Sequence, residues 1–223
     1  MRVETRQLSK EGLSVSKQAH ILAIEIPDPD FTGFRETDPI AYLAEGTIWI
    51  GPRPHLETLD PTHGEHPHRN SILQFIPYVV VRHRGDILAY IRPTHGNEGR
   101  LHGKVSVGVG GHVDLADVVH EDSVVDLDAT LRQSCAREIM EEIGHHVEPS
   151  AITWDGLIVR RDTDVDRVHL GVVAHIDLTD NEKAGLRPNP EIGEVRFMDA
   201  STFAAEMAEY DIEPWSRAVL HID

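Results

Sequence analysis

The chain has 223 residues, of which 40% are hydrophobic, and a formal net charge of −17 at neutral pH. This length suits one large domain, or one domain of about 150 residues with an extension. The negative charge argues against general binding to nucleic acid or to anionic membranes, because both need clustered Lys and Arg. A small anionic substrate is still compatible, since a bound cation reverses the local sign of the charge.

Cysteine content and apolar runs indicate the cellular compartment of the protein. Cys135 is the sole cysteine, which excludes an intramolecular disulfide and a thiolate metal cluster. The N-terminal stretch has no apolar signal core, and no apolar run approaches the roughly 18 to 20 residues of a membrane span. We therefore expect a cytoplasmic protein with no membrane partner.

Residues 1–70 contain short apolar runs without a clear period. We expect strands at 20–27 and 47–54 and a short helix at 38–46. The stretch 57–70 has the Pro, Gly and polar content of a loop, and its three histidines are either solvated or metal ligands. We expect residues 1–70 to be an N-terminal extension that packs on the core or makes a homodimer contact.

The pattern is clearer in residues 71–223, which we expect to form the main domain. Two β-rich runs at 71–83 and 86–93 are separated by Arg-Gly and predict a hairpin. Further elements are expected as follows: a strand at 105–113, a helix at about 129–143 with Asp128 as N-cap and Gly144 as C-cap, strands at 152–161 and 167–178, a loop at 181–194, a strand at 195–199 and a helix at 201–210. This irregular order predicts an α/β (α+β) fold with a mixed sheet flanked by helices.

The segment REIMEEIG, residues 137–144, gathers three glutamates on one side of the expected helix. Successive helical residues are offset by about 100°, so Glu138, Glu141 and Glu142 share an arc of about 100°. Ile139 and Ile143 fall on nearly the opposite side, where they are able to pack on a sheet. Like charges at this spacing repel one another. The pattern therefore indicates either an ordinary solvated helix face or a site for a cation.

A strand that ends in a glycine pair precedes this helix, and glycines there allow a ligand to approach the backbone closely. Strand, glycine pair and acidic helix together resemble the Nudix hydrolase family, whose signature is G-x5-E-x7-R-E-U-x-E-E-x-G-U, with U a bulky apolar residue. His145 stands where the family has its last apolar residue. The second half of the signature is otherwise matched by Arg137, Glu138, Ile139, Glu141, Glu142 and Gly144.

The first half of the signature is matched less well. Gly111 and Arg137 lie 26 positions apart, about twelve more than in the family pattern. The family's first glutamate therefore corresponds to Asp114, Asp117 or Glu121, and the sequence leaves these alternatives open. A lengthened loop of this kind resembles a Nudix branch described as predicted phosphoesterases. The resemblance covers roughly residues 74–220.

The resemblance implies a Nudix-type α/β/α sandwich and a pyrophosphohydrolase that cleaves a diphosphate linkage in a nucleoside diphosphate derivative. It implies a Mg²⁺ or Mn²⁺ cofactor held by Glu138, Glu141 and Glu142, and carboxylate oxygens suit both ions. The resemblance also implies that Glu142 shares the role of the catalytic base. Arg137 belongs to the same catalytic set, where it pairs with Glu141 or braces a neighbouring loop.

The base of this family often lies in a later loop, which makes Glu191 and Glu194 candidates, with Glu191 ahead. Both acids are also compatible with a solvated loop.

His112 is compatible with a structural role as well, and the basic side chains are compatible with a position on the solvated surface. The candidates for substrate binding are Arg92, Arg100, Lys104, Gly110, Gly111 and His112, with His102 beside them.

A second hypothesis is a Nudix-fold sensor or regulatory module that binds the ligand without turnover. Loss of the helix carboxylates would favour this reading, but all three are present. The altered first half of the signature keeps it open. Fold does not fix the substrate, so the sequence leaves its identity undetermined.

Overall fold

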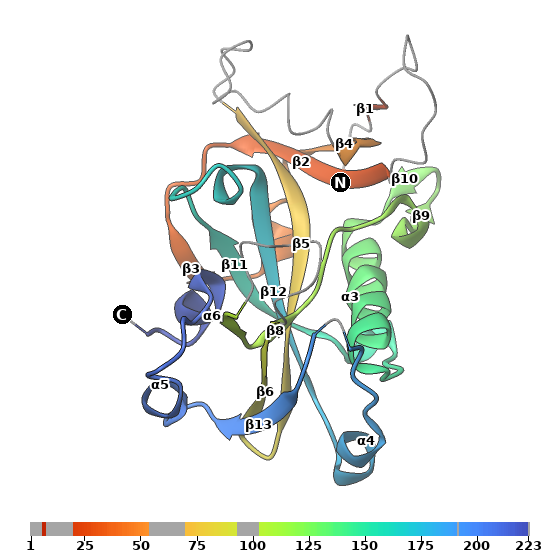
Figure 1. Cartoon of the computed structure of the whole chain (residues 1–223). Helices are drawn as coiled ribbons and strands as arrows, with labels where there is room; N and C mark the ends of the chain where they lie inside the picture. Colours follow the sequence, from red (N-terminus) through yellow and green to blue (C-terminus); the bar gives the residue numbers. More distant parts are fainter. Residues whose placement is uncertain (1–5, 8–19, 54–69, 93–102, 191, 223) are drawn as a thin grey trace. The chain divides into compact units, whose positions relative to one another are not determined.

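The computed structural model describes residues 6–7, 20–53, 70–92, 103–190 and 192–222 (Figure 1). The chain divides into two compact units. The first comprises Met1–Pro77, His112–Ser134 and Gly156–Val172, and the second Tyr78–Gly111, Cys135–Asp155 and Val173–Asp223. Arg100, His102, Glu191 and the histidines of the expected loop at 57–70 lie outside the described residues.

Strands are numerous and helices are mostly short. The strands are β1 (Arg6–Gln7), β2 (His20–Pro27), β3 (Gly33–Glu36), β4 (Thr47–Pro52), β5 (Asn70–His83), β6 (Asp86–Ile91), β7 (Val105–Ser106), β8 (Gly108–Val109), β9 (His120–Glu121), β10 (Val124–Val125), β11 (Thr153–Val159), β12 (His169–Asp177) and β13 (Val195–Asp199). The helices are α1 (Pro39–Tyr42), α3 (Leu127–Ile143), α4 (Asp180–Gly185), α5 (Phe203–Glu206) and α6 (Pro214–Val219), with 3-10 turns η3 (Leu115–Asp117), η4 (Pro149–Ala151) and η5 (Asp166–Val168). No helix in the described ranges has the length and apolar character needed to cross a membrane.

In the first unit, strand β2 pairs on both of its edges. It runs antiparallel to β4, with Ala23 opposite Trp49, and antiparallel to β5, with Ala23 opposite Gln74. Strand β1 joins β4 in the parallel direction, which confirms the expected mixed pairing. Strands from residues 20–53 therefore continue the sheet beside the start of β5. The expected boundary between an extension and the main domain at residue 70 stays a prediction.

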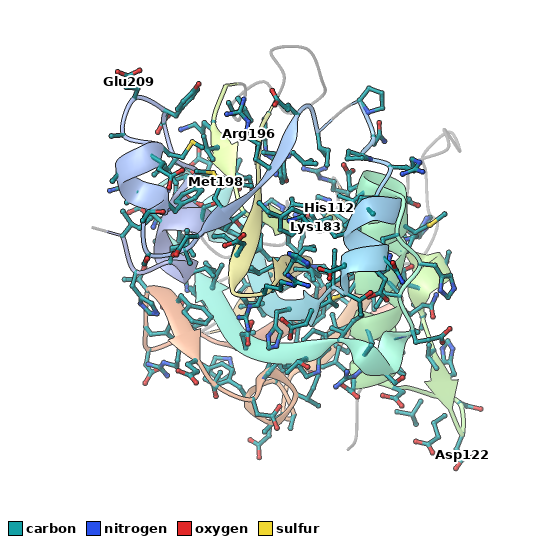
Figure 2. All side chains as sticks on the ribbon, turned by 90° about the horizontal axis from the view of Figure 1, so that it is seen from below. His112, Asp122, Lys183, Arg196, Met198 and Glu209 are labelled. Atoms are coloured by element: carbon teal, nitrogen blue, oxygen red, sulfur yellow. The ribbon has the colours of Figure 1, made fainter. Side chains whose placement is uncertain are left out.

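The first unit also contains two strand pairs that the sequence did not predict. Strand β3 pairs antiparallel with β11, with Arg35 opposite Leu157. Strands β9 and β10 form a small hairpin within the acidic stretch before α3. Asp122 lies at the tip of this hairpin (Figure 2). The turn residues Asp122 and Ser123 both have positive φ, 48° and 68°, as a two-residue type I′ turn requires.

In the second unit, the end of β5 and strand β6 form the predicted hairpin. Arg84 and Gly85 occupy the turn with φ of 52° and 91°, a conformation that glycine adopts without steric cost. Strand β6 then pairs with β7 and with β13, which places Leu88 opposite Phe197. The end of β5 also pairs with β8. Every one of these pairs is antiparallel.

The core of the second unit holds helix α3 against these strands. Cys135, Ile139 and Ile143 of the helix are fully buried among apolar residues of the strands. Neighbouring core members are Val79, Val81, Leu88, Tyr90, Val109, Ala174, Ile176 and Leu178. The apolar side of α3 is thereby fixed, and the side that carries the glutamates is set by the same packing.

Several element boundaries differ from the sequence expectation. The expected strand at 105–113 is two short strands, β7 and β8, which end at Val109. Helix α3 begins at Leu127 because Asp126 is the cap: its Oδ1 accepts a hydrogen bond from Ala129 N at 3.1 Å. Asp128, the expected cap, lies in the first turn and pairs with Arg132. The expected loop at 181–194 begins with helix α4, whose start is stabilised by a capping box between Thr179 and Glu182.

The expected helix at 201–210 is also shorter than predicted. Ser201 does not open it, because its hydroxyl donates instead to Asp199 Oδ1 at 2.6 Å. Helix α5 starts two residues later at Phe203, whose ring is fully buried. The Ser201 side chain therefore stabilises the turn before the helix.

Candidate active site

Helix α3 ends at the glycine predicted as its C-cap. Gly144 has a φ of 64°, and its N–H donates to the Met140 carbonyl at 3.1 Å. The following chain returns to this helix end, because Arg187 N donates to Ile143 O at 2.8 Å and Asn189 N donates to Glu142 O at 2.7 Å. The last turn of α3 is therefore held by backbone contacts from the loop that carries Glu191.

Arg137 joins two of the three glutamates. Its Nη1 donates to Glu138 Oε1 at 2.8 Å and to Glu141 Oε2 at 2.9 Å. The guanidinium thus places one positive charge between two carboxylates of the predicted arc. The expected contact with Glu141 is therefore present, and Glu138 shares the same guanidinium.

Glu138 differs from its neighbours because it is buried. It is 6% exposed, whereas the side chain of Glu141 is 54% exposed. Burial raises the pKa of Glu138 to about 7, and the nearby Glu141 and Glu142 act in the same direction, while Arg137 opposes them. The charged form of Glu138 is therefore unfavourable in the metal-free protein, and a nearby cation would stabilise it.

Gly111 is in contact with this buried carboxylate. A Cβ atom at Gly111 would lie 2.6 Å from Glu138 Oε1, closer than any side chain tolerates. The absence of a side chain at this position is therefore what leaves room for the carboxylate. The predicted link between the glycine pair and the acidic helix is a direct contact.

The donor set fits a hard divalent cation. Glu138, Glu141 and Glu142 offer carboxylate oxygens, which Mg²⁺ and Mn²⁺ prefer, and Arg137 shows that one positive centre is able to reach two of them. In the part of the chain that the structure describes, no three His, Cys, Asp or Glu side chains already converge as a metal site. The carboxylates and the guanidinium would have to rearrange when a cation binds.

The predicted phosphate-binding residues are engaged with acids. Arg92 N donates to Lys104 O at 2.9 Å, so these two residues lie side by side as expected. Lys104 Nζ lies 2.6 Å from Asp211 Oδ2, and Arg92 Nη2 lies 3.9 Å from Glu213 Oε2. The Arg92 guanidinium also lies over the ring of Tyr90, 5.3 Å from its centroid.

His112 belongs to a different cluster from the acidic helix. In the first unit its Nε2 lies 3.0 Å from Gln74 Oε1 and 3.3 Å from His169 Nε2. Burial and the charge of Arg53 lower the pKa of His112 to about 3. Sequence reasoning did not identify Gln74 or His169, because both lie inside apolar strand runs with no motif around them.

The three candidates for the first signature acid have distinct surroundings. Asp117 is buried, and its Oδ2 accepts from Asp114 N at 2.9 Å, so this pair forms the cap of η3. Glu121 is exposed on β9.

Glu194, the second candidate for the catalytic base, is also exposed. Its carboxylate pairs with Arg196 at 3.1 Å, as a solvated surface acid does.

The architecture is that of a known class of proteins. Tm1382, a proposed Nudix hydrolase, superimposes with a TM-score of 0.64 and 20% identity, over 91% of this chain and 97% of Tm1382. A MutT Nudix hydrolase from Burkholderia pseudomallei matches with a TM-score of 0.46 and 17% identity, over 66% of this chain and 95% of that protein. The chain has the Nudix fold, and the predicted α/β class is confirmed.

Sequence comparison adds one curated relative. Protein YmaB of Bacillus subtilis (strain 168) is 29% identical over 150 residues, which are 67% of this chain and 70% of YmaB. No protein-family model matches the chain. The structural comparison therefore shows the Nudix fold that was expected from the sequence.

Proposed function

We propose that the protein is a divalent-metal-dependent pyrophosphohydrolase that cleaves a diphosphate linkage in a nucleoside diphosphate derivative. The observation that carries this proposal is the buried carboxylate of Glu138, which sits against Gly111 and shares one positive charge with Glu141. A purely solvated helix face would not bury one of its acids. The Nudix fold agrees with this chemistry without fixing the substrate.

Glu138, Glu141 and Glu142 would hold the cation in this proposal. Bound Mg²⁺ or Mn²⁺ supplies polarisation of the phosphoryl oxygens and acidification of a water molecule. The rigid backbone of α3 keeps the three carboxylates in one arc, since Cys135, Ile139 and Ile143 anchor its other side. Arg137 orients Glu138 and Glu141 and limits their mutual repulsion in the metal-free protein.

Glu191, with a share for Glu142, is the proposed base. Asn189, two residues before Glu191, donates through its backbone to Glu142 O at 2.7 Å. Its side-chain Nδ2 donates to Glu141 O at 3.4 Å. On the other side, Ile192 belongs to the apolar core with Ile139 and Ile143. Glu191 itself lies outside the described residues, so its role as the base is proposed from the sequence, with the exposed Glu194 as the alternative.

Arg92, Arg100, Lys104 and the backbone at Gly110 and Gly111 are the proposed phosphate-binding groups. The pair between Lys104 and Asp211 is open to exchange, because Asp211 is largely exposed and such pairs contribute little free energy. A phosphate of the substrate would replace Asp211 as the partner of the Lys104 ammonium group. We leave His112 out of this set because its ring contacts Gln74 and His169.

The test is a hydrolysis screen with the full chain and Mg²⁺ or Mn²⁺. Dinucleoside polyphosphates, ADP-ribose, nucleotide sugars, coenzyme A and NADH are incubated separately, and released phosphate is measured after phosphatase treatment. Turnover of at least one compound that is abolished by chelation supports the proposal. Thermal stabilisation by a nucleotide with no turnover of any compound would instead indicate the non-catalytic sensor.

The role of residues 1–70 is open to a separate proposal. We propose that they shape the fold around β5 and do not take part in the chemistry, since β2 pairs directly with β5. A truncation that starts near Ser71 is expected to lose stability. Sedimentation of the full chain at several concentrations tests the expected homodimer.

A further inference from the structure

Three polar side chains from separate parts of the sequence meet within the first unit. Gln74 lies on β5, His112 directly follows Gly111 in the chain, and His169 begins β12. Gln74 is 1% exposed and His169 6% exposed, whereas His112 is half-buried. None of them belongs to the carboxylate set of α3.

The proton positions in this cluster leave one lone pair directed at His112. His169 Nδ1 lies 2.7 Å from the Val165 carbonyl, and because a carbonyl only accepts, Nδ1 carries the proton. In the neutral ring Nε2 is then unprotonated, and this atom faces His112 Nε2. A ring nitrogen fixed by a carbonyl on its opposite side is the arrangement that metal-binding histidines show.

The distances in the cluster are those between ligands of one metal ion. With Zn–N bonds of about 2.0 to 2.1 Å and tetrahedral angles, two ligand nitrogens lie about 3.3 to 3.4 Å apart. The two Nε2 atoms are 3.3 Å apart, and His112 Nε2 lies 3.0 Å from Gln74 Oε1. The Gln74 amide faces His112 with its oxygen, and its Nε2 is buried with no hydrogen-bond partner within the described ranges.

We propose that Gln74, His112 and His169 form a binding site for a divalent transition metal, with Zn²⁺ as the best match. Two imidazoles select ions that prefer nitrogen, so Mg²⁺ is not a competitor for this site. The three ligands are neutral and leave a coordination position for water. A bound ion would connect β5, the residue after the glycine pair and the start of β12.

One nearby charge opposes the ion. Arg53 lies close enough to His112 to contribute to the low pKa of that ring, and its positive charge repels a cation in the same way. Moderate affinity is therefore expected. Arg53→Gln is expected to bind Zn²⁺ more tightly than the wild type, by about threefold to tenfold.

The experiment measures Zn²⁺ binding to the full chain in excess Mg²⁺, by competition with a chromogenic chelator. The wild type is expected to bind one more equivalent than His112→Ala or His169→Ala, and to show a thermal stabilisation by Zn²⁺ that both variants lose. Co²⁺ in place of Zn²⁺ should give the visible bands of a four-coordinate ion only in the wild type. His120→Ala, which removes an exposed histidine of β9, is the matched control and should behave as the wild type.

A second variant keeps the test decisive if the alanine variants do not fold. Gln74→Glu replaces a neutral ligand by a charged one and completes a His₂Glu set, so affinity for Zn²⁺ should rise at least tenfold. Equal Zn²⁺ stoichiometry in the wild type and both histidine variants would overturn the proposal. Unchanged affinity in Gln74→Glu would overturn it as well. Neither result bears on hydrolysis, because the readout is metal binding.

Discussion

Gly111 lies against Glu138 so closely that a Cβ atom on the glycine would be 2.6 Å from the Oε1 atom of the carboxylate. Gly111→Ala should therefore displace the Glu138 side chain, since a carboxylate moves more easily than a backbone. We expect kcat/KM of the proposed metal-dependent hydrolysis to fall at least tenfold, with a small change in Tm. Gly185→Ala in α4 is the matched control, because a Cβ there meets no atom within 4 Å. A wild-type kcat/KM in Gly111→Ala would show that the contact between Gly111 and Glu138 is not needed for turnover.

The charged oxygens of Glu141 and Glu142 are expected to be essential for turnover. Glu141→Gln and Glu142→Gln keep side-chain size and remove one negative charge each. Turnover should fall by about two orders of magnitude or more, because a bound ion loses a ligand. Circular dichroism should be unchanged. Glu148→Gln, an exposed acid beyond the end of α3, is the control. Equal rates in all variants would exclude the carboxylates from the mechanism.

The raised pKa of Glu138 predicts a pH dependence of stability in metal-free buffer. The folded protein holds a proton on Glu138 up to about pH 7, while the unfolded chain releases it near pH 4.5. The folded state therefore binds more protons in this window, and its stability falls as pH rises from about 5 to about 7. Glu138→Gln lacks this loss, so its stability relative to the wild type should increase by about 1 to 3 kcal/mol between pH 5 and pH 8.

Urea denaturation of both proteins at pH 5 and pH 8 with a chelator measures this difference. A stability difference that does not change with pH would contradict the burial of an ionisable Glu138. Added Mg²⁺ should reduce the difference at pH 8, since a cation stabilises the charged carboxylate of the wild type and not the amide.

A buried hydroxyl in the second unit should be important for stability. Ser216 Oγ lies 2.8 Å from the Tyr78 hydroxyl and accepts a hydrogen bond from Val107 N at 3.1 Å. Ser216→Ala leaves two buried polar groups without this partner, which should cost about 1 to 3 kcal/mol in the free energy of unfolding. Ser150→Ala, at an exposed position of η4, should change it by less than about 0.5 kcal/mol. A Ser216→Ala variant as stable as the wild type would show that other groups satisfy Tyr78 and Val107.

Local patterns were sufficient to predict most elements of the fold. The hairpin of β5 and β6 followed from two apolar runs around Arg84 and Gly85, and the end of α3 from Gly144. The start of α3 was placed wrongly because Asp126 and Asp128 are both competent caps, and only the hydrogen bond to Ala129 distinguishes them. Helix α4 was missed because its short capping box lies in a stretch rich in turn residues.

The candidate site was predictable only in part. Helical periodicity places the three glutamates on one arc, but it does not reveal that Glu138 is buried and Glu141 exposed. Glu138 packs against Gly111, a residue distant in sequence, and periodicity does not show that contact. The cluster of Gln74, His112 and His169 depends on contacts between distant strands, and no local pattern encodes it.

The proposed hydrolysis requires that the carboxylates of α3 hold a divalent cation. The most direct measurement is the anomalous difference density of crystals soaked in Mn²⁺ with a non-hydrolysable diphosphate analogue. We expect a peak within coordination distance of Glu138 and at least one of Glu141 and Glu142, lost in the Glu138→Gln variant. Well-ordered analogue with no Mn²⁺ peak beside these side chains would contradict it.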